Sequence, residues 1–174
     1  MVSQETSQAI FSGDVEKLRA LRETGGEEFA RQRTEKEAWN LLHMALLAPK
    51  DRTPIVAIEY LLQLGVEANA QDCYGNTPLN YAARAKYVEA MRLLLDRGAS
   101  IDLANNDGVT PLRQTLLSKP YFVAATELLL ARGANPEAKM KHGKTVREFA
   151  HLVCRGADKA IGDLFEKYGK AEAG

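Results

Sequence analysis

The tripeptide Gly143-Lys144-Thr145 is the first place in the sequence where residue types and spacing suggest chemistry. A phosphate-binding loop ends in Gly-Lys followed by Ser or Thr, but it also needs an earlier glycine so that backbone N–H groups can face the phosphate. That earlier glycine would stand where the chain has Ala138. A turn followed by a threonine N-cap explains the same three residues. We therefore expect no nucleotide and no other cofactor.

The histidines and cysteines are scattered along the chain rather than clustered. His142 and His151 have no serine, cysteine or carboxylate at a spacing that would build a proton relay. Cys73 and Cys154 lie far apart, without the Cys-x-x-Cys or Cys/His spacing that closes around a metal. We expect two reduced thiols, no metal site, no catalytic residue and no enzymatic activity.

Composition narrows the class of protein further. The chain has 174 residues, of which 45% are hydrophobic and 26% charged, as expected for a protein with one core. Its 23 basic residues balance its 23 acidic residues, so no net charge draws it to nucleic acid or to a membrane surface. The N-terminus does not resemble a signal peptide, and no apolar run is long enough to span a bilayer. We expect a cytoplasmic protein that is monomeric when alone.

Two sequence landmarks alternate along the chain in fixed phase. One is a glycine followed by Thr-Pro-Leu, and its second copy stands 33 residues after the first, with a more divergent copy 35 residues later. The other is a pair of leucines followed by a turn glycine. The copies of the first are 75–79, 108–112 and 143–147, and those of the second are 61–65, 94–99 and 129–134.

Each landmark has a physical reason. Threonine before proline starts a helix, because the threonine oxygen accepts a free backbone N–H and proline at the first helical position loses no needed donor. Glycine after the paired leucines suits a left-handed helix stop. Between them, Tyr81-Ala82-Ala83 lets two helices approach closely, and residues 88–95 carry an apolar stripe at helical spacing. One repeat cannot bury that stripe alone, so the pattern predicts stacked repeats.

Together the landmarks resemble the ankyrin repeat, whose pattern is roughly Asp-x-x-Gly-x-Thr-Pro-Leu-His-x-Ala-Ala, followed by a second helix that ends Leu-Leu-x-x-Gly-Ala. The resemblance implies an all-α solenoid of about five stacked helix-turn-helix units with short β-hairpin or turn fingers. Residues 9–21 resemble an N-terminal capping repeat without its hairpin, and residues 143–165 resemble a C-terminal capping repeat. We expect one ankyrin-repeat domain over 1–174, with units at about 3–28, 34–68, 71–103, 104–138 and 139–170.

The second unit departs from this pattern. Leu42-His43-Met44-Ala45 keeps the Leu-His-x-Ala core, but Asn40-Leu41 replaces Thr-Pro and Ala38 replaces the turn glycine. We therefore expect an irregular finger in this unit. The resemblance gives His43 a structural role, in which it hydrogen-bonds the backbone of a neighbouring finger.

In ankyrin proteins the usual contact surface is the concave side, made by the finger tips and the exposed positions of each first helix. Carried over position by position, the resemblance implies a partner-binding face formed by Trp39, Leu47, Cys73, Tyr74, Asn76, Arg84, Asn106, Asp107, Val109, Lys141, His142 and Lys144. Two roles stay open for Trp39. It is either an anchor for the partner, or it packs over the Ala38 turn and seals the N-terminal cap.

The resemblance implies a non-enzymatic module that binds a partner protein. A more specific hypothesis is an inhibitor or immunity protein that covers a toxin or enzyme, which the shortness of the chain suggests. The alternative is binding of nucleic acid or another polyanion through the basic C-terminal repeat, which contains Lys139, Lys141, Lys144, Arg147 and Arg155. The balanced overall charge and the lack of aromatic residues among these lysines make nucleic acid the less favoured partner. We expect no membrane partner.

Overall fold

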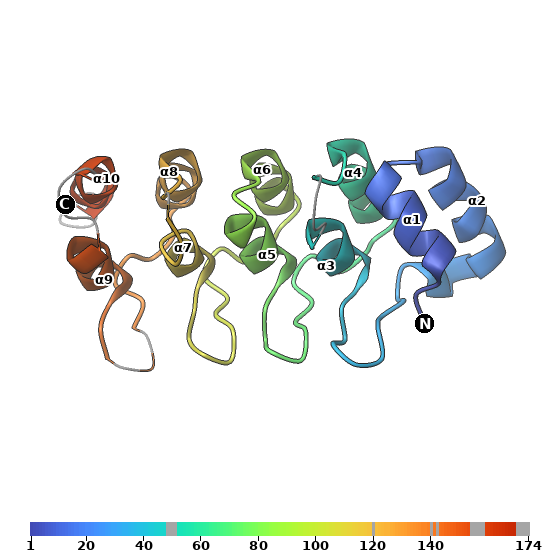
Figure 1. The fold of residues 1–174 in the computed structure, drawn as a ribbon, viewed down its shortest axis with the longest axis horizontal. Coiled ribbons are helices and arrows are strands. Elements are labelled where there is room, and N and C mark those ends of the chain that lie inside the picture. The colour runs from blue at the N-terminus through green and yellow to red at the C-terminus, as the bar shows by residue number, and fades with distance from the viewer. Residues whose placement is uncertain (48–51, 120, 140, 142, 154–158, 170–174) are drawn as a thin grey trace.

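The computed structural model describes residues 1–47, 52–119, 121–139, 141, 143–153 and 159–169, which form five helix pairs stacked in a row (Figure 1). The first pair is α1 (Gln4–Ser12) and α2 (Val15–Gly25), and a 3-10 helix, η1 (Gly26–Phe29), follows it. The next pairs are α3 (Leu41–Leu46) with α4 (Ile55–Gln63), α5 (Pro78–Arg84) with α6 (Val88–Asp96), α7 (Pro111–Gln114) with α8 (Val123–Ala131), and α9 (Val146–Val153) with α10 (Lys159–Gly169).

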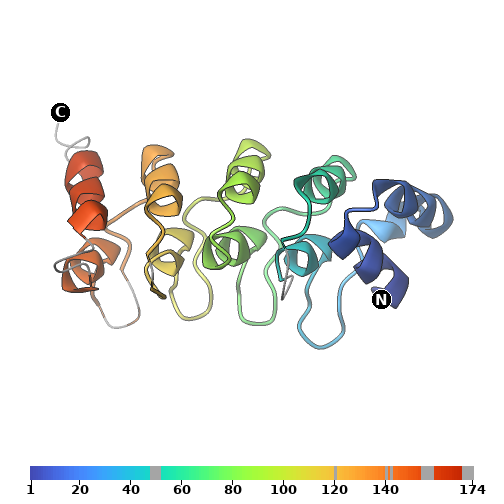
Figure 2. The same ribbon diagram turned by 45° about the horizontal axis from the view of Figure 1, so that its top comes forward.

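The helices lie in two layers, with loops projecting below them. In Figure 1, α3, α5, α7 and α9 form the lower layer, and α4, α6, α8 and α10 lie above them. The loop that enters each of these lower helices extends away from the layers as a finger, and the tilted view keeps the same order (Figure 2). Each expected unit range contains one helix pair, while the unit boundaries themselves stay a prediction.

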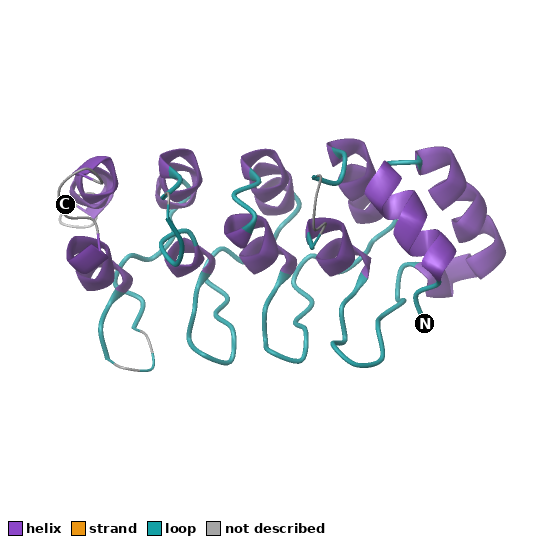
Figure 3. Ribbon diagram, in the orientation of Figure 1, coloured by secondary structure: helices purple, strands orange, loops and turns teal. Residues whose placement is uncertain are grey.

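The fingers are turns rather than paired strands. Among the described residues, Figure 3 shows helices and loops but no strand. Isolated bridges close two of the fingers, one between Arg33 and Asn40 and the other between Lys139 and Thr145. The all-α repeat solenoid is therefore confirmed.

Side-chain caps begin the lower helices as the landmarks predict. Thr77 and Thr110 each accept the backbone N–H of the residue three positions later, at 3.3 and 3.2 Å. Asn40, which replaces threonine in the second unit, accepts two N–H groups at the start of α3, both at 3.1 Å. The change from threonine to asparagine therefore keeps the helix start, because both side chains offer an oxygen at the N-cap.

Apolar side chains between the two layers form one continuous core from Ile10 in α1 to Phe165 in α10. Leu42, Leu79 and Leu112, one from each central lower helix, are 0% exposed. The apolar stripe predicted on α6 packs into the same core. Each helix pair thus buries its stripe against its neighbours, as stacking requires.

The finger of the second unit contains one residue more than the finger that follows it. It closes from the Thr34 N–H to the Trp39 carbonyl at 2.9 Å, whereas the next finger closes from Asp72 to Asn76 at 3.0 Å. Ala38 has a φ of 58°, in the left-handed region that glycine occupies at this place in the other fingers. The expected irregularity is therefore an added residue together with an alanine held in a glycine conformation, which is sterically costly.

Replacing Ala38 by glycine should stabilise the protein. Left-handed backbone costs a residue with a Cβ about 1 kcal/mol, so Ala38→Gly should raise the free energy of unfolding by up to about that amount. Urea denaturation monitored by circular dichroism measures the change. Ala85→Gly is the matched control, because Ala85 ends α5 with a φ of −74° and gains nothing from glycine. Equal effects of the two substitutions would contradict the assignment of strain to Ala38.

Candidate protein-binding face

Neighbouring fingers are joined through their backbones. The N–H of Cys73 donates to the Glu37 carbonyl at 2.9 Å, and the N–H of Asn106 donates to the Tyr74 carbonyl at 3.0 Å. The Asn106 side chain adds a bond to the Cys73 carbonyl at 3.3 Å. Because backbone atoms make these bonds, the finger tips are fixed while the side chains of Cys73 and Tyr74 stay exposed.

The finger tips present exposed side chains of several kinds. Tyr74 is 60% exposed, and it offers an aromatic ring at the tip of the third unit's finger. Lys141 Nζ donates to Asp107 Oδ1 at 3.0 Å, which couples the last two fingers through exposed side chains. The other predicted tip residues that are exposed are Cys73, Asn106 and Lys144. His142 lies outside the described residues.

A buried polar cluster joins the finger of the third unit to the helices behind it. Asp72 is 6% exposed, and its Oδ1 accepts the N–H groups of Tyr74 and Asn76 at 2.9 and 2.8 Å. Its Oδ2 accepts the Tyr81 hydroxyl at 2.6 Å and the indole N–H of Trp39 at 3.3 Å. One carboxylate therefore holds the finger backbone and two aromatic side chains.

Trp39 uses this cluster to connect the second unit to the third. Its indole N–H also lies 3.0 Å from the Tyr81 hydroxyl, and the two rings meet edge to face with centroids 6.5 Å apart. The side chain is half-buried, and these partners belong to the third unit rather than to the N-terminal cap. A contribution of Trp39 to partner binding stays a prediction.

The contacts within this cluster shift the pKa values of Asp72 and Tyr81. Burial by itself raises the pKa of Asp72, but the Tyr81 hydroxyl, the N–H groups of Asn76 and Tyr74 and the nearby His43 hold that pKa below its usual range. Burial and the Asp72 carboxylate raise the pKa of Tyr81 to about 12. At neutral pH the pair is therefore a carboxylate and a phenol. Repeat spacing did not reveal this pair, although Asp72 occupies the aspartate position that opens the ankyrin pattern.

His43 is fully buried and plays the structural part that the resemblance implied. Its Nε2 lies 2.9 Å from the Asn76 carbonyl of the next finger, and its Nδ1 accepts the Asn40 N–H at 3.2 Å. Burial lowers the pKa of His43, so the ring is neutral at pH 7 and Nε2 carries the proton toward the carbonyl. Both ring nitrogens are thus occupied by the fold.

The predicted positions behind the tips are less exposed. Asn76 and Val109 are half-buried, and the Asn76 side-chain oxygen accepts a bond from Asn105 at 2.8 Å. Leu47 is half-buried at the end of α3 and packs against the core. Arg84 is exposed, and its guanidinium lies 4.4 Å from the centre of the Tyr81 ring. Of these four residues, Arg84 therefore offers the most surface to a partner.

The basic residues of the last unit are partly neutralised by acidic neighbours. Lys141 pairs with Asp107, and Arg147 pairs with Glu137. The Gly143-Lys144-Thr145 motif is a turn and a helix start, because Thr145 and Glu148 exchange N–H bonds at 2.8 and 3.1 Å. Arg155 lies outside the described residues. These pairings leave less free positive charge for a polyanion than the sequence suggests.

No group of three or more histidine, cysteine, aspartate or glutamate side chains is placed to hold a metal ion within the described ranges. In the same part of the chain, no helix has both the length and the apolar character needed to cross a bilayer.

A side chain added at Gly75 should separate two fingers. A Cβ there would stand 2.7 Å from the Asn106 backbone nitrogen, and the φ of 78° already disfavours any residue but glycine. Gly98→Ala is the matched control, because its φ of 84° imposes the same strain while nothing lies within 4 Å of the added carbon. We expect Gly75→Ala to lower the free energy of unfolding by at least about 1 kcal/mol more than Gly98→Ala. Equal losses would show that the finger contact contributes little.

Removing the Tyr81 hydroxyl should destabilise the fold and change its pH dependence. Tyr81→Phe leaves the buried Asp72 carboxylate short of a donor, so we expect a loss of about 1.5–3 kcal/mol at pH 7. Because the folded-state pKa of Tyr81 is raised to about 12, its stabilising effect is complete below the unfolded value of about 10 and is lost as pH rises from 10 through 12. Between pH 7 and pH 11, the free energy of unfolding should therefore fall less for Tyr81→Phe than for wild type, as denaturation at the two pH values would show. Tyr74→Phe, at an exposed tyrosine, should behave as wild type.

Comparison with known proteins gives consistent matches. The family model for ankyrin repeats (three copies) matches this chain over residues 7–107 and again over residues 53–140. An ankyrin repeat protein of Fowlpox virus (strain NVSL) is 27% identical over 116 residues, which cover 67% of this chain and 23% of that protein. The ankyrin repeat, SAM and basic leucine zipper domain-containing protein 1 of Rhinolophus ferrumequinum is 30% identical over 145 residues, covering 68% of this chain and 29% of that protein.

A shorter and closer match is the ankyrin repeat domain-containing protein 37 of Xenopus tropicalis, which is 47% identical over 49 residues, 28% of this chain and 30% of that protein. The chain thus spans less than a third of the length of each of these relatives. Ankyrin repeats are generally non-enzymatic modules that bind other proteins. The phased landmarks, the stacked helix pairs and the matched span of residues 7–140 agree, and the chain belongs to the ankyrin-repeat family.

Proposed function

We propose that this chain is a non-enzymatic module that binds a partner protein through the face made by its finger tips and the exposed ends of its lower helices. One observation supports this most directly: the tips of adjoining fingers are hydrogen-bonded through their backbones, while their side chains stay exposed. A surface ordered before binding loses little conformational entropy when a partner arrives. The polar cluster around Asp72 adds to that order.

Tyr74 and Arg84 are the proposed anchors of this face. Tyrosine and arginine are enriched among the interface residues whose truncation costs most, often about 2 kcal/mol or more. Tyr74 is 60% exposed at a finger tip, and Arg84 is exposed at the end of α5 in the same unit. Trp39 is a weaker choice for mutation, because its bonds to Asp72 and Tyr81 would be lost as well.

Affinity capture from the source organism, followed by titration of the recovered partner, tests the proposal. Tyr74→Ala together with Arg84→Ala should weaken binding by about 30-fold or more, as expected for loss of about 2 kcal/mol. The control is Val56→Ala together with Arg92→Ala, two exposed residues on upper helices, which should bind as wild type. Thermal melting verifies that each variant is folded. Equal affinity of the two double variants would contradict binding through the proposed face.

The finer form of the proposal is that binding blocks the partner's own activity, as an inhibitor or immunity protein does, in the cytoplasm. A rigid surface without catalytic groups can act by covering part of its partner, which supports this form. Adding purified chain to the recovered partner and measuring that partner's activity tests it. Full activity of the saturated complex would contradict blocking while leaving protein binding in place.

A further inference from the structure

Five side chains occupy the same place in the five units. Leu47, Arg84 and Leu117 each stand seven residues after the N-cap residue of their lower helix. Leu152 stands seven residues after Thr145, which caps the start of α9. Phe11 is eight residues after the N-cap of α1, but it stands two residues before the left-handed Gly13, as Arg84 stands two residues before the left-handed Lys86. We call these five residues the inner-face row. Four are large and apolar, and the central one is an arginine.

The apolar members of the inner-face row are unusually exposed. Phe11, Leu117 and Leu152 keep 40%, 47% and 46% of their surface exposed, and Leu47 is half-buried. Single exposed apolar residues are common on protein surfaces, but their recurrence at one position of successive repeats supports an interaction site. Leu47 packs in part against the core, whereas Phe11, Leu117 and Leu152 are not among the side chains that form it.

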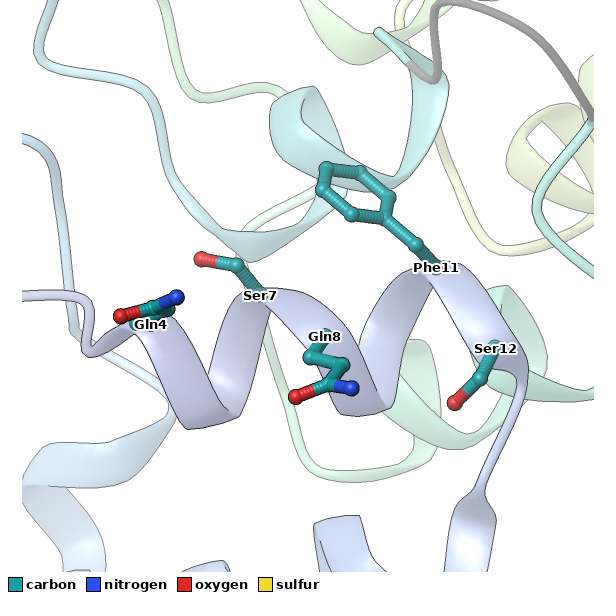
Figure 4. A pocket seen from close by; sticks show the side chains of 5 residues that line it. All are labelled: Gln4, Ser7, Gln8, Phe11 and Ser12. Carbon is teal, nitrogen blue, oxygen red and sulfur yellow. The ribbon is translucent and has the colours of Figure 1, made fainter.

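The surface is hollowed at Phe11 but closely packed at Arg84. Figure 4 shows Phe11 standing beside a shallow depression on the open side of α1, whose lining residues share one face of the helix: Gln4, Ser7, Gln8, Phe11 and Ser12. At the corresponding side of α5, two units along, five side chains converge and leave no space for a water-sized group: Asn76, Asn80, Tyr81, Arg84 and Gln114. The ligand therefore meets a phenyl ring beside a depression in the first unit and a guanidinium group on a packed surface in the third.

The spacing of the inner-face row fits a helical ligand better than an extended one. Packed helices lie about 8–10 Å apart, so successive row members are separated by about that distance. A helix laid along the row advances about 10 Å in seven residues and returns nearly to the same side. An extended segment covers the distance in about three residues, and its side chains alternate between opposite faces. A β-strand therefore cannot place successive contacts on one face at this spacing, whereas an α-helix places about one contact in every seven residues.

The positive charge of Arg84, in the middle of the inner-face row, determines which type of ligand residue can lie opposite it. The guanidinium of Arg84 lies over the Tyr81 ring, and no ion pair among the described residues includes Arg84. A carboxylate is the group that pairs best with an exposed guanidinium. Resting on the ring limits the positions of the guanidinium, so the carboxylate must stand close to the ligand's central contact.

Building on the proposed protein-binding function, we propose that the inner-face row holds an amphipathic α-helix of the partner protein. This helix has an apolar residue at every seventh position except the one opposite Arg84, which is an aspartate or glutamate. Apolar contacts to Leu47 and Leu117 flank the ion pair on either side. The fingers then contact parts of the partner outside the helix.

A peptide display library tests this helix directly. The library presents a monomeric helical peptide in which the position of each heptad that faces one common side is randomised. Selection on wild-type protein should enrich apolar residues at the outer randomised positions and aspartate or glutamate at the central one. Selection on Arg84→Glu should enrich lysine or arginine at the centre, and Arg84→Met should abolish the charge preference. Arg92→Glu on α6 is the control and should select the same peptides as wild type.

Titration of a selected peptide gives the quantitative result. Changing its central acid to lysine should weaken binding to wild type at least tenfold, and Arg84→Glu should restore it. Enrichment that is the same for wild type and Arg84→Glu, or no helical binder at all, would overturn the proposed helix. If a natural partner nevertheless requires Tyr74 and Arg84, protein binding through this face still stands. If that partner also binds equally well without Tyr74 and Arg84, the proposed binding face is wrong as well.

Discussion

The apolar stripe on each helix pair can leave water only by packing against the next pair, and this constraint gives the molecule its shape. Leu42, Leu79 and Leu112 sit at equivalent places in three units and are all fully buried. The core therefore continues along the stack from Ile10 to Phe165 rather than closing into a sphere. A stacked core leaves one long side of the lower helices uncovered, and that side is available for binding.

The fingers depend on a different force, because they have almost no core of their own. In the third unit the Asp72 carboxylate accepts two backbone N–H groups of its finger, and in the fourth unit Asn105 accepts two at 3.0 and 2.9 Å. One side chain at the start of each of these fingers thus sets the turn. The side chains at the tips, such as that of Tyr74, are not needed to form the turn and can therefore differ from unit to unit.

Sequence alone predicted the elements whose cause is local. The threonine caps at Thr77 and Thr110, the stacked pairs and the irregular finger around Ala38 follow from residue types and spacing. The partners of Trp39 could not be predicted in this way, because its indole meets side chains that lie more than thirty residues further along the chain. Likewise, the sequence shows the lysines of the last unit but not that Lys141 stands beside Asp107.

The cluster that orders the finger of the third unit also orders part of the proposed binding face. Asp72 fixes the Tyr81 hydroxyl at 2.6 Å, and the Tyr81 ring in turn supports the Arg84 guanidinium at 4.4 Å. An arginine on a surface ordinarily loses rotamer freedom when it pairs with a partner's carboxylate. Here part of that loss has already occurred on folding, because the ring limits where the guanidinium can lie. A buried carboxylate that contacts no partner can therefore strengthen binding through the exposed arginine in front of it.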